Sequence, residues 1–283
     1  MSRRIFSLAK KLLPRISDTE LIALQSGTVS IDRDIMSGRV DMTKLKTLTN
    51  EEGHYLNEGL IDICSKLQFE KVFDGTINSK VLDVLNKNGA FSYIIKQEYG
   101  GLELPVETQS RVLVKLASIN PALAVTVMVP NSLGPGELLQ QYGTDKQKQA
   151  FLPKLATGEY IPCFGLTGPH NGSDAGGKGL DVGRVMIVNG RHIIRVVLDK
   201  RYITLAPIAN LMGIAIHVDD PDELLDVGSP GITVALLDKK KYPNLDNSKY
   251  HNPLSVGFPN GTLKGTIDID VDDIIGGAKN IGH

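Results

Sequence analysis

The spacing of apolar residues changes once along the chain and divides it into a helical and a β-rich part. Leu56, Leu60, Ile63, Cys64 and Leu67 repeat at intervals of three and four, which is the spacing of one helical face. After about residue 158 the period becomes two, in short β-rich runs at 185–188, 191–198, 202–205, 212–218, 231–237 and 265–269. The pattern predicts an α+β fold, with an N-terminal α-helical bundle followed by an antiparallel β-barrel or sandwich.

Polar residues mark where several of the helices should begin. Thr49 with Glu52, and Thr144 with Gln147, have the spacing of a capping box, in which side chains satisfy backbone N–H groups at a helix start. The same spacing occurs at 17–20. Asn78 precedes another apolar run of helical period and is a favourable N-cap. Residues 105–128 predict one or two further helices, so the first half of the chain should be helical throughout.

Glycine and proline predict where elements turn or end. Asn189-Gly190, between two β-rich runs, is the clearest hairpin signal in the chain. Pro153 falls inside the helix predicted after Thr144, where it indicates a kink or a break. The change of period places a boundary near 158–160. We therefore divide the chain into four parts: a basic amphipathic N-terminal extension at 1–48, an α-helical domain at 49–158, a β-domain at 159–276 and, at 277–283, the expected start of a C-terminal helical domain that the chain lacks.

A glycine-rich stretch at 161–177 lies where the helical part passes into the β-rich part. Its first half predicts a buried strand, and Gly168-Pro169 predicts a turn just after Thr167. Backbone N–H groups in such a turn, with the hydroxyls of Thr167 and Ser173, could bind a flat, acceptor-rich heterocycle or a phosphate. A plain glycine-rich connection between strands fits the same composition.

A second stretch, Lys200-Arg201-Tyr202-Ile203-Thr204, follows farther along the chain. Together the two stretches resemble the paired flavin-binding signatures of the acyl-CoA dehydrogenase family. Residues 98–102 and 142–159 extend this resemblance in the family's order, and it covers roughly 15–283. The residues at 129–139 and 201–209 look most like those of the bacterial long-chain, FadE-type branch.

The resemblance implies a bound FAD. The residues that it places at the cofactor are Phe164, Gly165, Leu166, Thr167, Ser173, Tyr202, Ile203 and Thr204. Thr167 would donate to the flavin ring system, Tyr202 would pack against it, and Thr204 would donate to N5. Ser173 would contact both the cofactor and the thioester end of an acyl-CoA. For the two threonines, a strand residue selected for its β-propensity is the alternative. We expect Thr167 and Thr204 to lie within about 15 Å of each other.

The reaction that the resemblance implies is dehydrogenation of a long-chain acyl-CoA to a trans-2-enoyl-CoA, as in fatty acid β-oxidation. In the family, a glutamate base removes the α-proton while hydride passes from Cβ to flavin N5. That glutamate belongs to a C-terminal helical domain, and no residue of this chain can be assigned to its role. We therefore expect the chain to be inactive alone, and leave its catalytic residues unassigned. His170 replaces a small residue of the signature and is interpreted as an exposed loop histidine.

The implied partners are a long-chain acyl-CoA, an electron acceptor such as an electron-transfer flavoprotein, and further copies of the chain in a homo-oligomer. Two other functions remain open: a non-catalytic flavin or acyl-CoA binding fragment, and an acyl-CoA oxidase-like enzyme. A net charge of −1 without a basic stripe gives no support to nucleic-acid binding. Cys64 and Cys163 lie far apart without metal-site spacing, which predicts free thiols, a reducing compartment and no metal.

The N-terminal extension is the one anomaly of composition. Residues 2–15 carry five basic side chains and no acidic one, and their apolar residues fall on one helical face. The resulting basic amphipathic helix could contact an anionic membrane surface, serve as a transit peptide or pack on the protein itself. Since no apolar run reaches about 18 residues, we expect a cytoplasmic protein, with peripheral contact at the inner membrane as the alternative.

Overall fold

The computed structural model describes residues 37–39, 41, 48–132, 134–172, 179–225 and 231–282. Residues 49–283 form one compact unit, and 1–48 form another. The helix predicted at 2–15 and the capping box at 17–20 lie outside the described residues. No helix in the described ranges is both long and apolar enough to cross a membrane.

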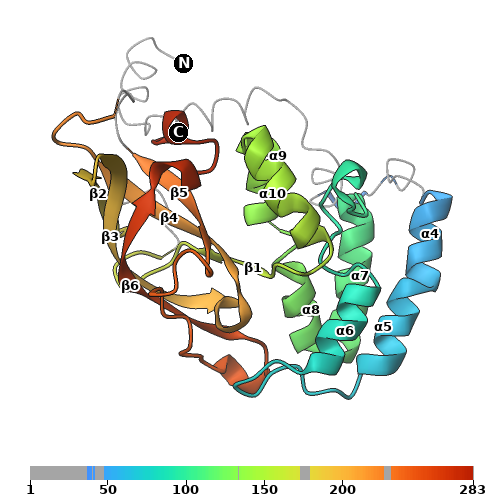
Figure 1. Ribbon diagram of the computed structural model, residues 1–283. Helices are drawn as coiled ribbons and strands as arrows, with labels where there is room; N and C mark the ends of the chain where they lie inside the picture. The colour runs from blue at the N-terminus through green and yellow to red at the C-terminus, as the bar shows by residue number, and fades with distance from the viewer. Residues whose placement is uncertain are drawn as a thin grey trace, which may run out of the picture. The chain divides into compact units, whose positions relative to one another are not determined.

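The first part of the larger unit is helical, as predicted. Its α-helices are α4 (Asn50–Asn57), α5 (Gly59–Leu67), α6 (Ser79–Lys87), α7 (Val106–Ile119), α8 (Pro121–Met128), α9 (Pro135–Tyr142) and α10 (Asp145–Ala156) (Figure 1). The capping boxes at Thr49 and Thr144 are formed, and Asn78 accepts from the backbone of α6. The sequence predicted a kink or a break at Pro153; helix α10 continues through Pro153 to its end, so it does not break there. Pro153 lacks only the one N–H that the helix would have used.

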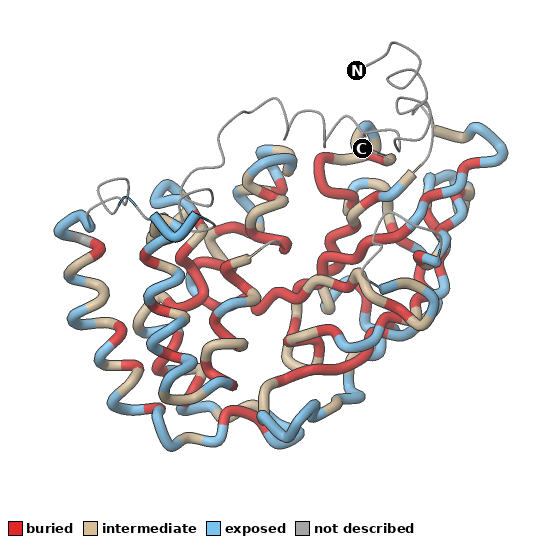
Figure 2. The backbone as a smooth tube through the Cα atoms, turned by 180° about the vertical axis from the view of Figure 1, so that it is seen from behind, coloured by how far each residue is buried: buried red, intermediate tan, exposed pale blue. Residues whose placement is uncertain are grey.

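The apolar face predicted for the helical part forms its core. Leu60, Ile63 and Leu67 are buried, and Leu56 and Cys64 pack at the margin of the same cluster. Figure 2 shows buried positions on the inner sides of the helices and exposed positions on their outer sides. Helical spacing alone therefore identified which side of α5 faces the protein interior.

Six strands follow in one strongly curved sheet (Figure 1). They are β1 (Pro162–Gly165), β2 (Val182–Val188), β3 (Arg191–Thr204), β4 (Leu211–Asp219), β5 (Ile232–Asp238) and β6 (Asn260–Asp270). Their order is β1-β4-β2-β3-β6, and β5 pairs with β4. Buried residues of all six strands form the core of the β part; among them are Cys163, Val185, Ile194, Ile214, Ala235 and Leu263.

The predicted fold class is confirmed, but the sheet is mixed and not purely antiparallel. Strands β1 and β2 both run parallel to β4, whereas the β2–β3, β3–β6 and β4–β5 pairs are antiparallel. Strand β1 pairs with the start of β4 and β2 with its end. Alternation of apolar residues has the same period in both kinds of pairing, so it does not predict strand direction.

Strand β3 also differs from the prediction in length. The turn Asn189-Gly190, with both residues at positive φ, joins β2 to β3 as predicted. The separate runs expected at 191–198 and 202–205 are one strand with an irregularity at Tyr202. The alternation was interrupted by Lys200, which is polar but fully buried. A buried lysine therefore made one long strand look like two.

Gln147 of α10 joins the helical part to the end of the β part. Its side-chain nitrogen donates to the carbonyls of Asp272 at 3.1 Å and Ile274 at 2.8 Å. Its side-chain oxygen accepts from the backbone N–H of Gly276 at 3.0 Å. The same oxygen accepts from Thr144 in the capping box. One buried amide thus satisfies four backbone groups on two distant segments.

We expect Gln147→Leu to lower the free energy of unfolding by about 2 kcal/mol, because these buried backbone groups would lose their partner. Urea denaturation followed by circular dichroism measures this. Gln141→Leu is the control, since Gln141 is exposed and bonds only Glu137, so its change should stay within about 0.5 kcal/mol. Equal destabilisation by both substitutions would contradict the role of Gln147.

Candidate functional site

The two signature stretches meet beside β3. The backbone N–H of Arg201 donates to the carbonyl of Thr167 at 3.1 Å. Strand β2 covers this edge of β3 only as far as Val196, so the edge beyond is open to the chain leaving β1. Thr204 lies three residues past Arg201, which at strand spacing places its Cα about 11 Å from that of Thr167.

The predicted cofactor residues differ in how far they are exposed. Gly165 and Ile203 are buried, whereas Phe164, Leu166, Thr167 and Thr204 are half-buried. Tyr202 is 61% exposed. The hydroxyls of Thr167 and Thr204 make no hydrogen bond within the described part of the chain. Ser173 lies outside the described residues, and its predicted contacts stay a prediction.

Phe164 lies between the sheet and a helix. Phe164 and Cys163 are neighbours in β1 and so point to opposite faces of the sheet, and Cys163 is fully buried in the β core. A Cβ placed on Gly213 of β4 would lie 3.0 Å from the Phe164 ring and 3.1 Å from Pro135 of α9. Glycine at 213 therefore leaves the space that the phenylalanine ring occupies beside α9.

Tyr202 has a strained backbone at this site. Its φ is 61°, and that of Leu205 is 67°, both in the left-handed region that bulky residues avoid. The irregular pairing with β6 at Tyr202 turns its side chain outward while Ile203 stays in the core. The Tyr202 ring lies 5.5 Å from that of His251, centroid to centroid. The buried Nε2 of His251 has no hydrogen-bond partner among the described residues.

A buried ion pair lies directly beneath the meeting point. The Lys200 side chain is 0% exposed, and its ammonium donates to the carbonyl of Leu166 at 3.1 Å. It lies 3.2 Å from a carboxylate oxygen of Asp181, which also accepts from the backbone N–H of Asp199 at 3.3 Å. Burial lowers the pKa of Lys200, while the charge of Asp181 acts in the opposite direction.

The carboxylates at this site are both engaged by lysines. Asp181 pairs with Lys200, and Asp199 pairs with Lys264 at 2.9 Å. Among the described residues, no other carboxylate hydrogen-bonds or ion-pairs with 164–167 or 200–204. A carboxylate held by a cation is a poor proton acceptor, because the pairing stabilises its ionised form. Among the described residues, the arrangement offers donors and an aromatic surface, and its two carboxylates are paired with lysines.

Comparison of the sequence with known proteins shows which proteins this chain resembles. Residues 66–159 match the model of the N-terminal domain of acyl-CoA dehydrogenases. An acyl-CoA dehydrogenase of Bacillus subtilis is 26% identical over 171 residues, which are 57% of this chain and 43% of that protein. The CarC subunit of the caffeyl-CoA reductase–Etf complex of Acetobacterium woodii is 30% identical over 169 residues, or 59% of this chain and 41% of that protein. Over these residues the chain is similar to acyl-CoA dehydrogenases.

The similarity in fold extends beyond residues 66–159. A glutaryl-CoA dehydrogenase of Mycobacterium smegmatis, solved with FADH2, superposes with a TM-score of 0.63 at 19% identity. The superposition covers 80% of this chain and 55% of that structure. The chain therefore shares the fold through its β part, and spans less than half the length of both curated relatives.

Sequence reasoning missed two residues of this acyl-CoA dehydrogenase-like site. From the sequence, Lys200 was assigned only as part of the second signature stretch. The signal that could have identified it is the interruption that it causes in the alternation of apolar residues along β3. His251 had no signal, because it reaches Tyr202 through a segment that pairs with β6 at the Tyr250–Gly261 bridge. His170 is exposed, as expected.

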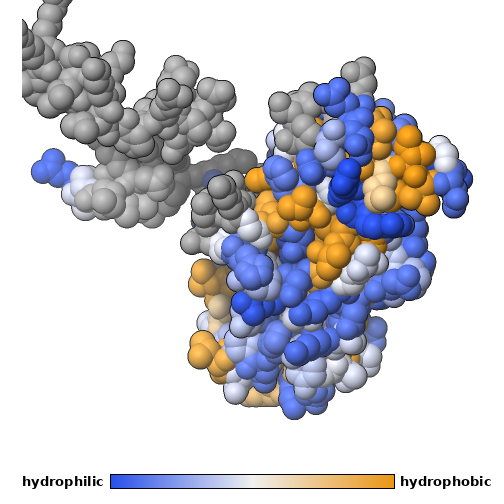
Figure 3. Space-filling model, turned by 90° about the vertical axis from the view of Figure 1, so that its left-hand side faces the viewer, coloured by the Kyte–Doolittle hydropathy of each residue, from blue (hydrophilic) through white to orange (hydrophobic). Residues whose placement is uncertain are grey.

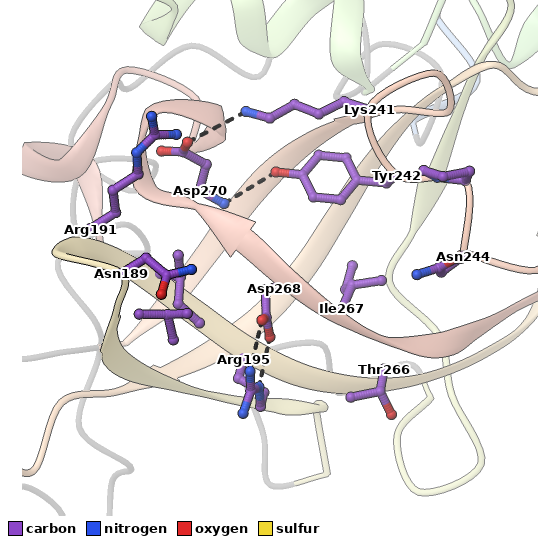
Figure 4. A pocket seen from close by; sticks show the side chains of 13 residues that line it. Asn189, Arg191, Arg195, Lys241, Tyr242, Asn244, Thr266, Ile267, Asp268 and Asp270 are labelled. Atoms are coloured by element: carbon purple, nitrogen blue, oxygen red, sulfur yellow. Dashed lines mark hydrogen bonds and ion pairs between the residues drawn. The ribbon is translucent and has the colours of Figure 1, made fainter.

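The pocket in Figure 4 lies away from the meeting point. It has a volume of about 860 Å³ and is bounded by β3, β6 and residues 241–244. Arg195 donates twice to Asp268, at 2.7 Å each, and lowers the pKa of that carboxyl. Lys241 lies 3.6 Å from Asp270. Since these charges are already paired, we assign the pocket no ligand.

An apolar surface also lies on the side of the sheet that carries the pocket of Figure 4. Figure 3 shows apolar side chains gathered there among charged ones. Val182 of β2 and Val197 of β3 are exposed and lie opposite each other on one face of the sheet, whereas the exposed Ile187 of β2 points to the other face. Exposed apolar residues in a group are typical of contact surfaces.

Proposed function

We propose that this chain forms the N-terminal and middle parts of an FAD-dependent acyl-CoA dehydrogenase. Its reaction would convert a long-chain acyl-CoA to the trans-2-enoyl-CoA in fatty acid β-oxidation. The observation that supports this most directly is the hydrogen bond between Arg201 and Thr167, which joins the two signature stretches in space. The relatives' names and the FADH2 of the Mycobacterium smegmatis structure support the choice of substrate class and cofactor.

The residues at the meeting point fit a flavin. When bound, FAD supplies a two-electron acceptor, and its reduction places negative charge on the ring system. Such a group needs hydrogen-bond donors that the protein does not already use, and the hydroxyls of Thr167 and Thr204 meet this condition in the described chain. The buried Oδ1 of Asn171 and Nε2 of His251 are further polar atoms without a protein partner.

Each residue then has a defined task. Thr167 and Thr204 donate to the ring, Thr204 at N5. Phe164 and Tyr202 supply aromatic surfaces that position the ring and exclude water. Ser173 contacts the cofactor and the thioester end of the acyl-CoA. Gly165, Leu166 and Ile203 form the backbone and core beneath.

The proposed partners are a long-chain acyl-CoA, an electron-transfer flavoprotein and further copies of the chain. The Acetobacterium woodii relative is named as part of an Etf complex, which supports the electron acceptor. The resemblance of 129–139 and 201–209 to the FadE-type branch supports the long chain. Residues 2–15 would provide peripheral membrane contact. The engagement of Asp181 and Asp199 by lysines favours a second candidate for the chain by itself, a non-catalytic flavin or acyl-CoA binding fragment.

The test is FAD binding by the full chain, followed by flavin fluorescence, with Thr204→Val as the variant. A lost hydrogen bond of ~1.5–3 kcal/mol to a charge-bearing group should lower the flavin reduction potential by ~30–60 mV or weaken flavin binding. Thr266→Val is the matched control, because Thr266 is an exposed strand residue of β6. Unchanged potential and affinity in Thr204→Val would reject the role of Thr204. Failure of the unaltered chain to bind FAD would reject the proposed cofactor.

A further inference from the structure

The glycine-rich stretch and its return to the sheet are held from below by one side chain. The structure describes 161–172 of the glycine-rich stretch, and 179–184 lead from it back to the sheet. The ammonium of Lys200 contacts both, through the carbonyl of Leu166 and the carboxylate of Asp181. It is 0% exposed, so neither contact competes with solvent.

The two flanks come close together above this lysine. A Cβ on Gly179 would lie 2.2 Å from the carbonyl oxygen of His170, so their backbones nearly touch. A Cβ on Gly168 would lie 2.9 Å from the carbonyl oxygen of Asp199, so the incoming flank also lies directly against β3. Backbone segments that approach each other this closely need an interaction that fixes both of them to the sheet.

Lys200 suits this task because of its length and its donors. Its stem passes Gly165, where a Cβ would lie 3.6 Å from Lys200 Cγ, and its ammonium then reaches the far side of β1. An ammonium has three donors and no acceptor, so it can serve the carbonyl and the carboxylate together. Asn171 donates to the same Leu166 carbonyl at 3.1 Å, which adds a second tie within the incoming flank.

We infer that Lys200 is the positioning residue of the flavin site: it fixes the two segments 164–172 and 179–184 and thereby places Thr167 relative to Thr204. The inference rests on the proposed function for its ligand. A buried ion pair contributes little net stability, since desolvation offsets the attraction, but it strictly defines the geometry of the groups that it joins. Lys200 itself contacts no reacting atom.

The experiment compares the full chain with Lys200→Met, Asp181→Leu and Lys264→Met. Lys264 also pairs with an aspartate of β3, Asp199, but the Lys264 side chain is 51% exposed. FAD affinity is measured by flavin fluorescence, and the exchange of amide hydrogens is measured in peptides covering 166–172 and 179–184. Circular dichroism establishes that each variant is folded.

Lys200→Met should weaken FAD binding about tenfold or more and speed exchange in both peptides, because each flank loses a charged hydrogen bond. Asp181→Leu should speed exchange mainly in 179–184, since Leu166 keeps its lysine. Lys264→Met should change neither quantity. A general loss of stability would instead speed exchange equally in both peptides for Lys200→Met and Asp181→Leu. If Lys200→Met does not fold, Asp181→Asn replaces it and should weaken FAD binding about threefold.

Two failures are distinguishable. Binding of FAD by Lys200→Met as tightly as by the unaltered chain would overturn the role of Lys200 and leave the proposed function standing. Absence of FAD binding in the unaltered chain would overturn the proposed function, while faster exchange in both peptides would still support the tie. Unchanged amide exchange in both peptides of Lys200→Met would overturn this role of Lys200, whether or not FAD binding changes.

Discussion

Palmitoyl-CoA added anaerobically to this chain in the presence of FAD should leave the flavin oxidised. Abstraction of the α-proton needs a free general base within hydrogen-bond reach, and loss of that base costs ~10²–10⁴ in rate. In the described chain, the carboxylate that bonds to the site is that of Asp181, which pairs with Lys200, while the neighbouring Asp199 pairs with Lys264.

The measurement is bleaching of the flavin absorption band on addition of palmitoyl-CoA. Reduction of the same sample by dithionite is the control, because it shows that the bound flavin can accept electrons. The acyl-CoA dehydrogenase of Bacillus subtilis serves as the positive control. Stoichiometric bleaching by this chain without another polypeptide would mean that residues 1–283 contain a working base, and our assignment of Asp181 and Asp199 would be wrong.

Gly101→Ala should have the largest effect on stability among single substitutions in the helical part. A Cβ at Gly101 would lie 1.9 Å from the carbonyl oxygen of Ile95 and 2.4 Å from its carbonyl carbon. Both atoms belong to the backbone, so no side-chain rotation can remove the clash. We expect a loss of more than about 3 kcal/mol in the free energy of unfolding, measured by urea denaturation.

The adjacent Gly100 provides a matched control. It has a φ of 84°, and a Cβ there would meet no atom within 4 Å. Gly100→Ala should therefore cost only the strain of a left-handed alanine, about 1–2 kcal/mol. Similar losses for the two substitutions would show that Gly101 is not in the close contact with Ile95 that we describe.

Local interactions made much of the fold predictable from sequence. The helix starts at Thr49, Asn78 and Thr144 depend on side chains that bond backbone groups two or three residues away. The hairpin at Asn189-Gly190 depends on the positive φ that these two residues accept. The buried face of α5 follows from helical spacing. In each case the residues that decide the structure are neighbours in sequence, so a short window contains the whole cause.

The candidate site was predictable as a pair of stretches but not as an arrangement. Resemblance identified 161–177 and 200–204, and the structure shows the hydrogen bond between Arg201 and Thr167 that joins them. The roles of Thr167 and Thr204 toward a flavin stay predictions. The contact between the stretches spans 34 residues, and no local signal encodes it.

Only the tertiary structure decided which strands run parallel, why β3 is continuous and what lies beneath the site. The direction of β1 relative to β4 depends on where the chain returns after 166–181, and apolar alternation is blind to direction. Lys200 can be buried only because Leu166 and Asp181, from two other segments, supply its partners. A charge without those partners would remain in water, because burying it alone costs several kcal/mol. The sequence by itself determined the elements, while the pairing of groups distant in the chain determined the site.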